Sequence, residues 1–80
     1  MTNHAKVYFD YFGYKIQSDV FCEICGLPAV DIHHLNGRGK GKDVIENLMA
    51  LCRSHHTEAH RSRVANENCK TIHRELLNIK

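Results

Sequence analysis

The chain has 80 residues, a formal net charge of +2 and 42% hydrophobic side chains. This ordinary hydrophobic content excludes disorder over most of the chain, and no apolar run approaches the roughly 20 residues that span a bilayer. A domain this small buries only about 60% of the surface that its unfolded chain exposes, so it usually needs a disulfide, a metal or a partner for stability.

Four Cys and seven His make a metal the favoured stabiliser. Residues 1–10 lack the pattern of a signal peptide, because Lys6 and Asp10 interrupt them. We therefore expect a cytoplasmic chain in a bacterial or phage-like setting, where structural disulfides are rare and Cys–His clusters bind metal. No linker or internal repeat divides the sequence, which predicts a single domain over residues 1–80.

The first predicted element is a short amphipathic helix over about residues 4–12. Thr2 or Asn3 would cap its start, and Gly13 stands where a helix often ends. Its stripe is expected to pack in the core rather than to bind a ligand, and consists of Val7, Tyr8, Tyr11 and Phe12.

Two short apolar runs, residues 29–35 and 48–51, predict a pair of antiparallel strands. A tight turn over residues 21–26 precedes the first strand, and Asn36-Gly37 marks a turn after it. The long connection between the strands alternates glycines with basic side chains, and we expect it to be flexible.

Two helices are predicted in the last third of the chain. The first spans about residues 54–64 with Ser54 as its N-cap, and the second is capped by Asn66. The apolar stripe of the second helix contains Cys69, Ile72, Leu76 and Ile79. Cys69 is expected to be a small core residue.

Two pairs of metal-ligand residues share a two-residue gap: Cys22 with Cys25, and Cys52 with His55. Zinc takes four nitrogen or sulfur ligands in a tetrahedron, and this gap lets one turn present both side chains to the same ion. The four residues therefore predict one closed structural zinc site that ties the turn before the first strand to the following helix. Such binding contributes directly to the free energy of folding.

A second group of histidines consists of His33, His34, His56 and His60. His56 and His60 are four residues apart, so they lie on one face of the expected helix. With His33 they would bind a metal that keeps positions open for water and substrate, as catalytic sites do. His34 would be the general base, since an unperturbed imidazole titrates near neutral pH. Neighbours in a strand point to opposite faces, so His33 and His34 share a site only at a strand end, a bulge or a strong twist.

Together, the segments CEIC, AVDIHHL and ENLMALCRSHHTEAH resemble the HNH endonuclease family, in the version with a zinc-knuckle staple. The resemblance implies an α+β fold of the ββα-metal (His-Me finger) type, with a motif core over residues 21–64 between an N-terminal and a C-terminal helix. It implies that His34 is the catalytic general base. Asn47 corresponds to the family's middle Asn, which braces the long loop through backbone hydrogen bonds. The implied ligands of the catalytic metal are His33, His56 and His60.

Zinc-stapled members usually have Cys at the position of His55, and the adjacent His55 and His56 leave the register of the two sites ambiguous. We assign His55 to the structural zinc because it completes the gap from Cys52, and His56 to the catalytic metal because it pairs with His60. Asp31, on the same strand face as a ligand histidine, either orients a ligand or is solvated.

The resemblance implies metal-dependent hydrolysis of DNA phosphodiester bonds, leaving 5′-phosphate and 3′-hydroxyl ends. Three imidazole ligands suit a divalent transition metal better than Mg²⁺, which prefers oxygen. Basic side chains near the expected site would contact DNA phosphates. The candidates are Arg63, Arg38 and Lys40, followed by Lys42 and Arg61.

Two other functions stay open. A non-catalytic zinc module that binds DNA or protein would need only the four-ligand site, and a metal-dependent ribonuclease would use the same residues as the DNA endonuclease. The second histidine group favours a nuclease, since a pure binding module has no need of it. Reading a long target, or cutting both strands, would require a homodimer, a partner protein or an added domain.

Overall fold

The structure, a computed structural model, describes residues 2–79 apart from the side chain of Ile79. Three helices and one two-stranded sheet confirm the α+β class within this range. None of the helices described is long and apolar enough to cross a membrane. The elements are α1 (Asn3–Phe12), the 3-10 turn η1 (Gln17–Asp19), β1 (Asp31–His34), the 3-10 turn η2 (Ile45–Asn47), β2 (Leu48–Leu51), α2 (Arg53–Arg61) and α3 (Arg63–Ile79).

The strands β1 and β2 form an antiparallel hairpin in which Asp31 is opposite Leu51 and His34 is opposite Leu48. The second strand has the predicted bounds, whereas the first is shorter at both ends than residues 29–35. Consequently His34 is the last residue of its strand, where the chain turns into the long loop.

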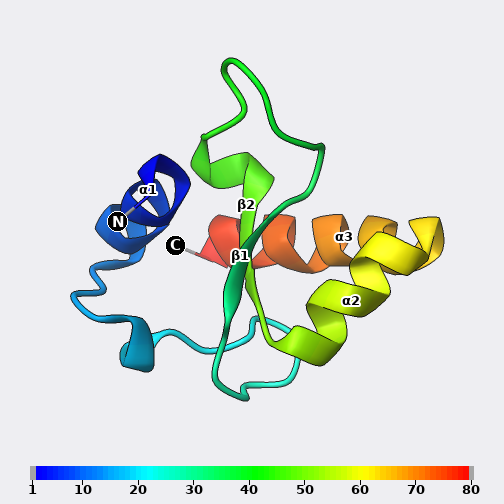
Figure 1. Cartoon of the computed structure of the whole chain (residues 1–80), viewed down its shortest axis with the longest axis horizontal. Coiled ribbons are helices and arrows are strands. Elements are labelled where there is room, and N and C mark those ends of the chain that lie inside the picture. Colours follow the sequence, from blue (N-terminus) through cyan, green and yellow to red (C-terminus); the bar gives the residue numbers. More distant parts are fainter. Residues whose placement is uncertain (1, 80) are drawn as a thin grey trace.

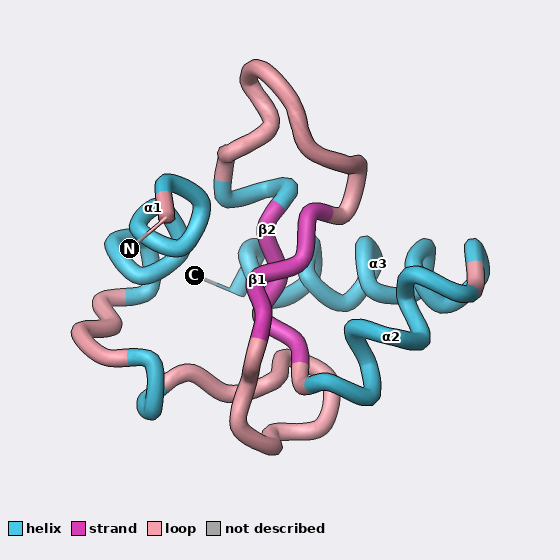
Figure 2. Tube along the Cα trace, in the orientation of Figure 1, coloured by secondary structure: helices cyan, strands magenta, loops and turns pink. Residues whose placement is uncertain are grey.

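Side chains alternate along the two strands, so the hairpin buries two separate clusters. The cluster that joins the sheet to α1 includes Ile32, Leu48, Ala50, Tyr8 and Phe9. The cluster that joins it to α2 and α3 includes Met49, Leu51, Ala59 and Cys69. Figure 1 and Figure 2 show the hairpin standing between α1 and α2. The neighbours His33 and His34 therefore face α2 and α1 respectively, as their ring contacts show.

The helix α1 has the predicted caps. The Thr2 hydroxyl accepts a hydrogen bond from the N–H of Ala5 at 3.3 Å, and Gly13 ends the helix with a φ of 77°. This left-handed backbone favours glycine. The predicted core stripe is partly wrong, because the helix turns Phe9 toward the sheet and leaves Tyr11 exposed.

The helix α2 begins earlier than predicted, and Ser54 is not its cap. Cys52 occupies the N-cap position with an extended backbone. Its carbonyl accepts the N–H of His56 at 2.9 Å and so closes the first helical turn. The predicted ligand pair Cys52 and His55 therefore spans the start of the helix.

The boundary between α2 and α3 also differs from the prediction. Ser62 is extended and ends α2 at Arg61, short of the predicted residue 64. Its hydroxyl accepts the N–H of Ala65 at 3.1 Å, so Ser62 rather than Asn66 caps α3. Asn66 lies inside α3, where its side chain reaches β1 instead.

A buried polar network, which the sequence patterns did not reveal, joins the Cys turn to α1 and α3. Glu23 accepts a hydrogen bond from the Tyr8 hydroxyl at 2.5 Å and pairs with Nδ1 of His73 at 2.7 Å. Nε2 of His73 donates to the carbonyl of Ile45 at 2.7 Å. Burial lowers the pKa of His73, but the hydrogen bond and charge of Glu23 outweigh it and raise the pKa above its usual value. A protonated His73 satisfies both acceptors and holds α3 in place.

Candidate functional site

The turn that begins at Cys22 presents the first two predicted zinc ligands. The N–H of Gly26 donates to the carbonyl of Cys22 at 3.0 Å, and Gly26 has a φ of 77°. Burial raises the pKa of the Cys22 thiol. The N–H groups of Cys52, Cys25 and Ile24 have the larger opposite effect, so the pKa falls to about 6. These N–H groups favour the thiolate, the form that binds metal.

The structure brings the four predicted zinc ligands together: Cys22, Cys25, Cys52 and His55. The two sulfurs of Cys25 and Cys52 are 3.8 Å apart, and Nδ1 of His55 lies 3.3 Å from the Cys52 sulfur and 3.6 Å from that of Cys22. Ligands at tetrahedral zinc with Zn–S bonds near 2.3 Å lie about 3.8 Å apart. The cluster therefore fits one zinc ion with little rearrangement.

Three further histidines, His33, His56 and His60, converge from β1 and α2 with ligand atoms within 4.8 Å of one another. The Nε2 atoms of His56 and His60 are 3.1 Å apart, and the His33 ring centroid is 5.1 Å from each of theirs. Asp31 contacts this group, since its carboxylate accepts Nδ1–H of His56 at 2.8 Å. This hydrogen bond leaves the Nε2 lone pair of His56 directed to the centre of the cluster.

Asn66, which the sequence predicted to cap the last helix, instead orients the ring of His33. The amide nitrogen of Asn66 donates to the carbonyl of Leu35 at 2.9 Å, so its oxygen accepts Nε2–H of His33 at 2.8 Å. Nδ1 of His33 therefore carries the lone pair. Burial chiefly lowers the pKa of His33 and favours the neutral form that binds metal.

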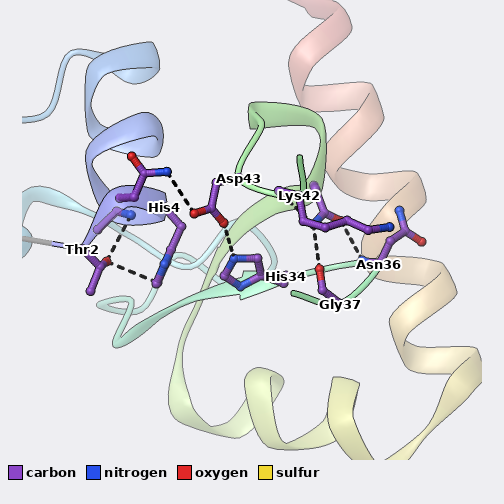
Figure 3. A network of polar contacts seen from close by, with 10 residues as sticks. Thr2, His4, His34, Asn36, Gly37, Lys42 and Asp43 are labelled. Atoms are coloured by element: carbon purple, nitrogen blue, oxygen red, sulfur yellow. Dashed lines mark hydrogen bonds and ion pairs between the residues drawn. The ribbon is translucent and has the colours of Figure 1, made fainter. Parts of the chain in front are cut away.

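On the other face of the hairpin, Nε2 of His34 lies 2.8 Å from a carboxylate oxygen of Asp43 (Figure 3). An ionised carboxylate only accepts hydrogen bonds, so the ring proton is on Nε2 and the lone pair is on Nδ1. Nδ1 is buried and has no hydrogen-bond partner among the described residues. The amide of Asn3 donates to the second Asp43 oxygen at 3.0 Å, and with His34 it lowers the pKa of Asp43.

Asp43 was not predicted to be a site residue. It stands in the glycine-rich loop among basic side chains, where a single carboxylate gives no sequence signal. Only the fold brings it to His34.

One cavity of about 290 Å³ connects the two faces at the end of β1. Its lining consists of His33, His34, Gly37, Arg38, His56 and His60. His34 reaches it because it ends the strand, one of the three conditions that would let neighbouring histidines share a site. Arg38 also lines this cavity, whereas the other two preferred phosphate contacts, Lys40 and Arg63, are exposed elsewhere.

The buried Asn47 braces the long loop. Its side-chain oxygen accepts the N–H of Asn36 at 2.6 Å. Its amide nitrogen donates to the carbonyls of Gly37 and Lys42 at 3.1 and 2.9 Å. The loop therefore closes around one side chain, which keeps its two ends beside the cavity.

Replacing Asn47 by Ala is expected to lower the free energy of unfolding by about 1–3 kcal/mol, because it leaves buried backbone groups of the loop unpaired. Urea unfolding measures the loss, and hydrogen exchange should show a less protected Asn36 amide. Asn68→Ala, an exposed position on α3, is the matched control. An unchanged exchange rate at Asn36 would contradict the bracing role.

A protein-family model described as "Putative HNHc nuclease" matches residues 4–77. The chain is 43% identical over 53 residues to "Uncharacterized protein YdfU" of Escherichia coli (strain K12), a match that covers 59% of the chain and 15% of that protein. It is 33% identical over 61 residues to "Mitochondrial DNA mismatch repair protein mutS homolog" of Sarcophyton glaucum, covering 64% of the chain and 6% of that protein. The chain thus spans a small part of these relatives. No solved structure matches it significantly.

Proposed function

The chain belongs to the HNH nuclease family, and from this premise we propose that it is a metal-dependent endonuclease that hydrolyses DNA phosphodiester bonds to 5′-phosphate and 3′-hydroxyl ends. The observation that carries the proposal is the cavity at which three clustered histidines meet a buried fourth, His34, whose Nδ1 has no partner among the described residues. The separate cluster of three cysteines and His55 would hold a structural zinc.

In this reaction His34 is the general base. Its Nδ1 takes a proton from a water molecule, whose oxygen attacks phosphorus as the bond to the 3′ oxygen breaks. Asp43 accepts the hydrogen bond from Nε2–H, so it holds the required tautomer and stabilises the imidazolium that forms. The 3′ oxygen leaves and takes a proton from solvent water to become the hydroxyl, and His34 later returns its own proton to solvent.

The donor set of the second cluster fits a divalent transition metal, because three neutral imidazoles suit such ions better than Mg²⁺. Held by His33, His56 and His60, the metal would polarise the phosphate and stabilise the leaving oxygen. Asp31 and Asn66 position His56 and His33 for this task.

Positive side chains would hold the DNA backbone against the cavity. Arg38 is the best placed, since it lines the cavity, and Lys40 and Arg63 would extend the contact over the surface. The printed name of one relative refers to DNA mismatch repair, which favours DNA over RNA as the substrate.

Supercoiled plasmid DNA incubated with the protein and one divalent metal at a time tests the proposal. We expect Ni²⁺, Co²⁺, Mn²⁺ or Zn²⁺ to support cleavage at least about tenfold faster than Mg²⁺, because of the imidazole ligands. If Mg²⁺ were the only metal that supports cleavage, the assignment of three histidine ligands would be overturned. Faster cleavage of structured RNA would identify a ribonuclease, and binding of DNA without cleavage in any metal would identify a zinc-binding module.

A further inference from the structure

A third cluster of metal-ligand side chains lies beside the proposed base. It consists of His4, His34 and Asp43, whose ligand atoms lie within 4.8 Å of one another. His4 comes from the first turn of α1, and Figure 3 shows its ring on the same side of His34 as Asp43. The ring centroids of His4 and His34 are 4.7 Å apart.

We propose that this cluster binds a divalent transition-metal ion, and that the bound ion switches His34 off as a general base. The regulatory half of this inference rests on the proposed nuclease function, whereas the binding half does not. The cluster shares no residue with the other two metal-ligand groups, so it can bind an ion while their ligands are occupied.

The donor set determines which ions fit. Two imidazoles and one carboxylate suit Zn²⁺, Co²⁺ or Ni²⁺ and disfavour Mg²⁺ and Ca²⁺. Nitrogen ligands of tetrahedral zinc lie roughly 3.3 Å apart. The ligand atoms of the cluster lie within 4.8 Å of one another and include the 2.8 Å pair of His34 and Asp43, so they must shift to surround an ion. His4 can supply this movement, because it is only partly buried and its Nε2 has a 3.3 Å contact with the exposed Thr2 hydroxyl.

The charges around the cluster allow a cation to bind. Burial, His34 and Arg38 together lower the pKa of His4 and favour its neutral, metal-binding form. Arg38 opposes a cation, but the carboxylate of Asp43 offsets this charge. Because Asp43 now bonds His34 and Asn3, a metal must compete with those hydrogen bonds, and we expect this to be the weakest of the three sites.

The position of one proton explains the switch. In the described structure the neutral His34 ring carries its proton on Nε2, where Asp43 accepts it. A metal bound at Nε2 needs a lone pair on that nitrogen. The proton of the neutral ring must therefore move from Nε2 to Nδ1. Nδ1 then donates a hydrogen bond and can no longer take a proton from water.

The variant His4→Gln separates binding from catalysis, because it removes one ligand and leaves His34 and Asp43 intact. Protein whose structural site is filled with zinc is titrated with Co²⁺, and bound metal is counted after equilibrium dialysis. We expect a total of three ions per chain for the unchanged protein, one for each cluster. We expect two for His4→Gln and three for the control Lys6→Gln on the same helix.

Nitrogen-15 NMR spectra of His34 in Zn²⁺ report the tautomer directly. Excess Zn²⁺ should move the ring proton from Nε2 to Nδ1 in the unchanged protein but not in His4→Gln. In the plasmid assay, excess Co²⁺ should lower kcat about 100-fold in the unchanged protein, which is within the usual contribution of a general base. His4→Gln should keep its rate within about twofold, because its base stays active.

Equal ion counts for the unchanged protein and His4→Gln, or an unmoved proton on His34, would overturn the metal site whether or not the protein cuts DNA. If a third ion binds but DNA cleavage is not slowed, the proposed switch is overturned and the metal site stands. If no DNA is cut under any condition, the proposed function and the switch both fail, but the ion count and the NMR spectra still decide the site.

Discussion

Replacing Cys52 by Ala is expected to leave the chain unfolded at 25 °C, whereas replacing Cys69 by Ala is expected to leave it folded. Both thiols are buried, but only Cys52 belongs to the four-ligand cluster. Structural zinc contributes about 10–16 kcal/mol in small zinc-finger peptides, which equals or exceeds the roughly 5–15 kcal/mol by which ordinary domains are stable. The loss of one ligand therefore removes more free energy than this small core can replace.

The Cys69 substitution removes one sulfur from an apolar environment and costs about 1 kcal/mol, a usual value for a point mutation. Far-UV circular dichroism and thermal unfolding of both variants measure the difference. A chelator should reproduce the Cys52→Ala result in the unchanged protein, and added Zn²⁺ should reverse it. Cooperative unfolding of Cys52→Ala at the parent temperature would show that the cluster holds no structural metal.

The parts of this fold that the sequence predicted depend on signals that act over one turn of the chain. Thr2 and Gly13 cap their helix through groups a few residues away. The two-residue gap between Cys22 and Cys25 presents both thiols from one turn. The same local reasoning missed the start of α2, where Ser54 looks like a better cap than Cys52.

The contacts that were not predicted join residues far apart in the chain. Asn66 looks like a helix cap, but Ser62 performs that task and Asn66 orients His33 across the core. The pair formed by Glu23 and His73 also depends on how α3 packs against the Cys turn. Such contacts are set by tertiary packing, which leaves no periodic pattern in the sequence.

For the candidate site, the sequence indicated which histidines belong together but not what orients them. The spacing of His56 and His60 predicts a shared face on any helix. The proton position on His34 is set by Asp43, a loop residue whose place depends on how Asn47 gathers the loop. The shared face of His56 and His60 was therefore predictable from spacing, and the tautomers of the site histidines were not.

Replacing His34 by Ala is expected to lower kcat for plasmid cleavage by about 10²–10⁴-fold, the usual contribution of a general base. It should still bind the structural and the catalytic metal, because His34 is in neither of the clusters proposed to hold them. His34→Gln retains more of the buried volume. It should show the same loss of kcat if the loss comes from the missing base rather than from poorer packing. Cleavage by either variant at the parent rate would show that His34 is not the base.

Asp43→Asn tests how the base is held. A buried aspartate in the same relation to a catalytic histidine contributes about 10⁴-fold in a well-known protease, but the Asp43 side chain is 30% exposed. We therefore expect a smaller loss, on the order of 10²-fold in kcat with little change in KM. Asp10→Asn, on the exposed face of α1, is the control. A parent-like kcat in Asp43→Asn would mean that burial alone sets the His34 tautomer. A loss equal to that of His34→Ala would mean that the ring cannot act as a base without the carboxylate.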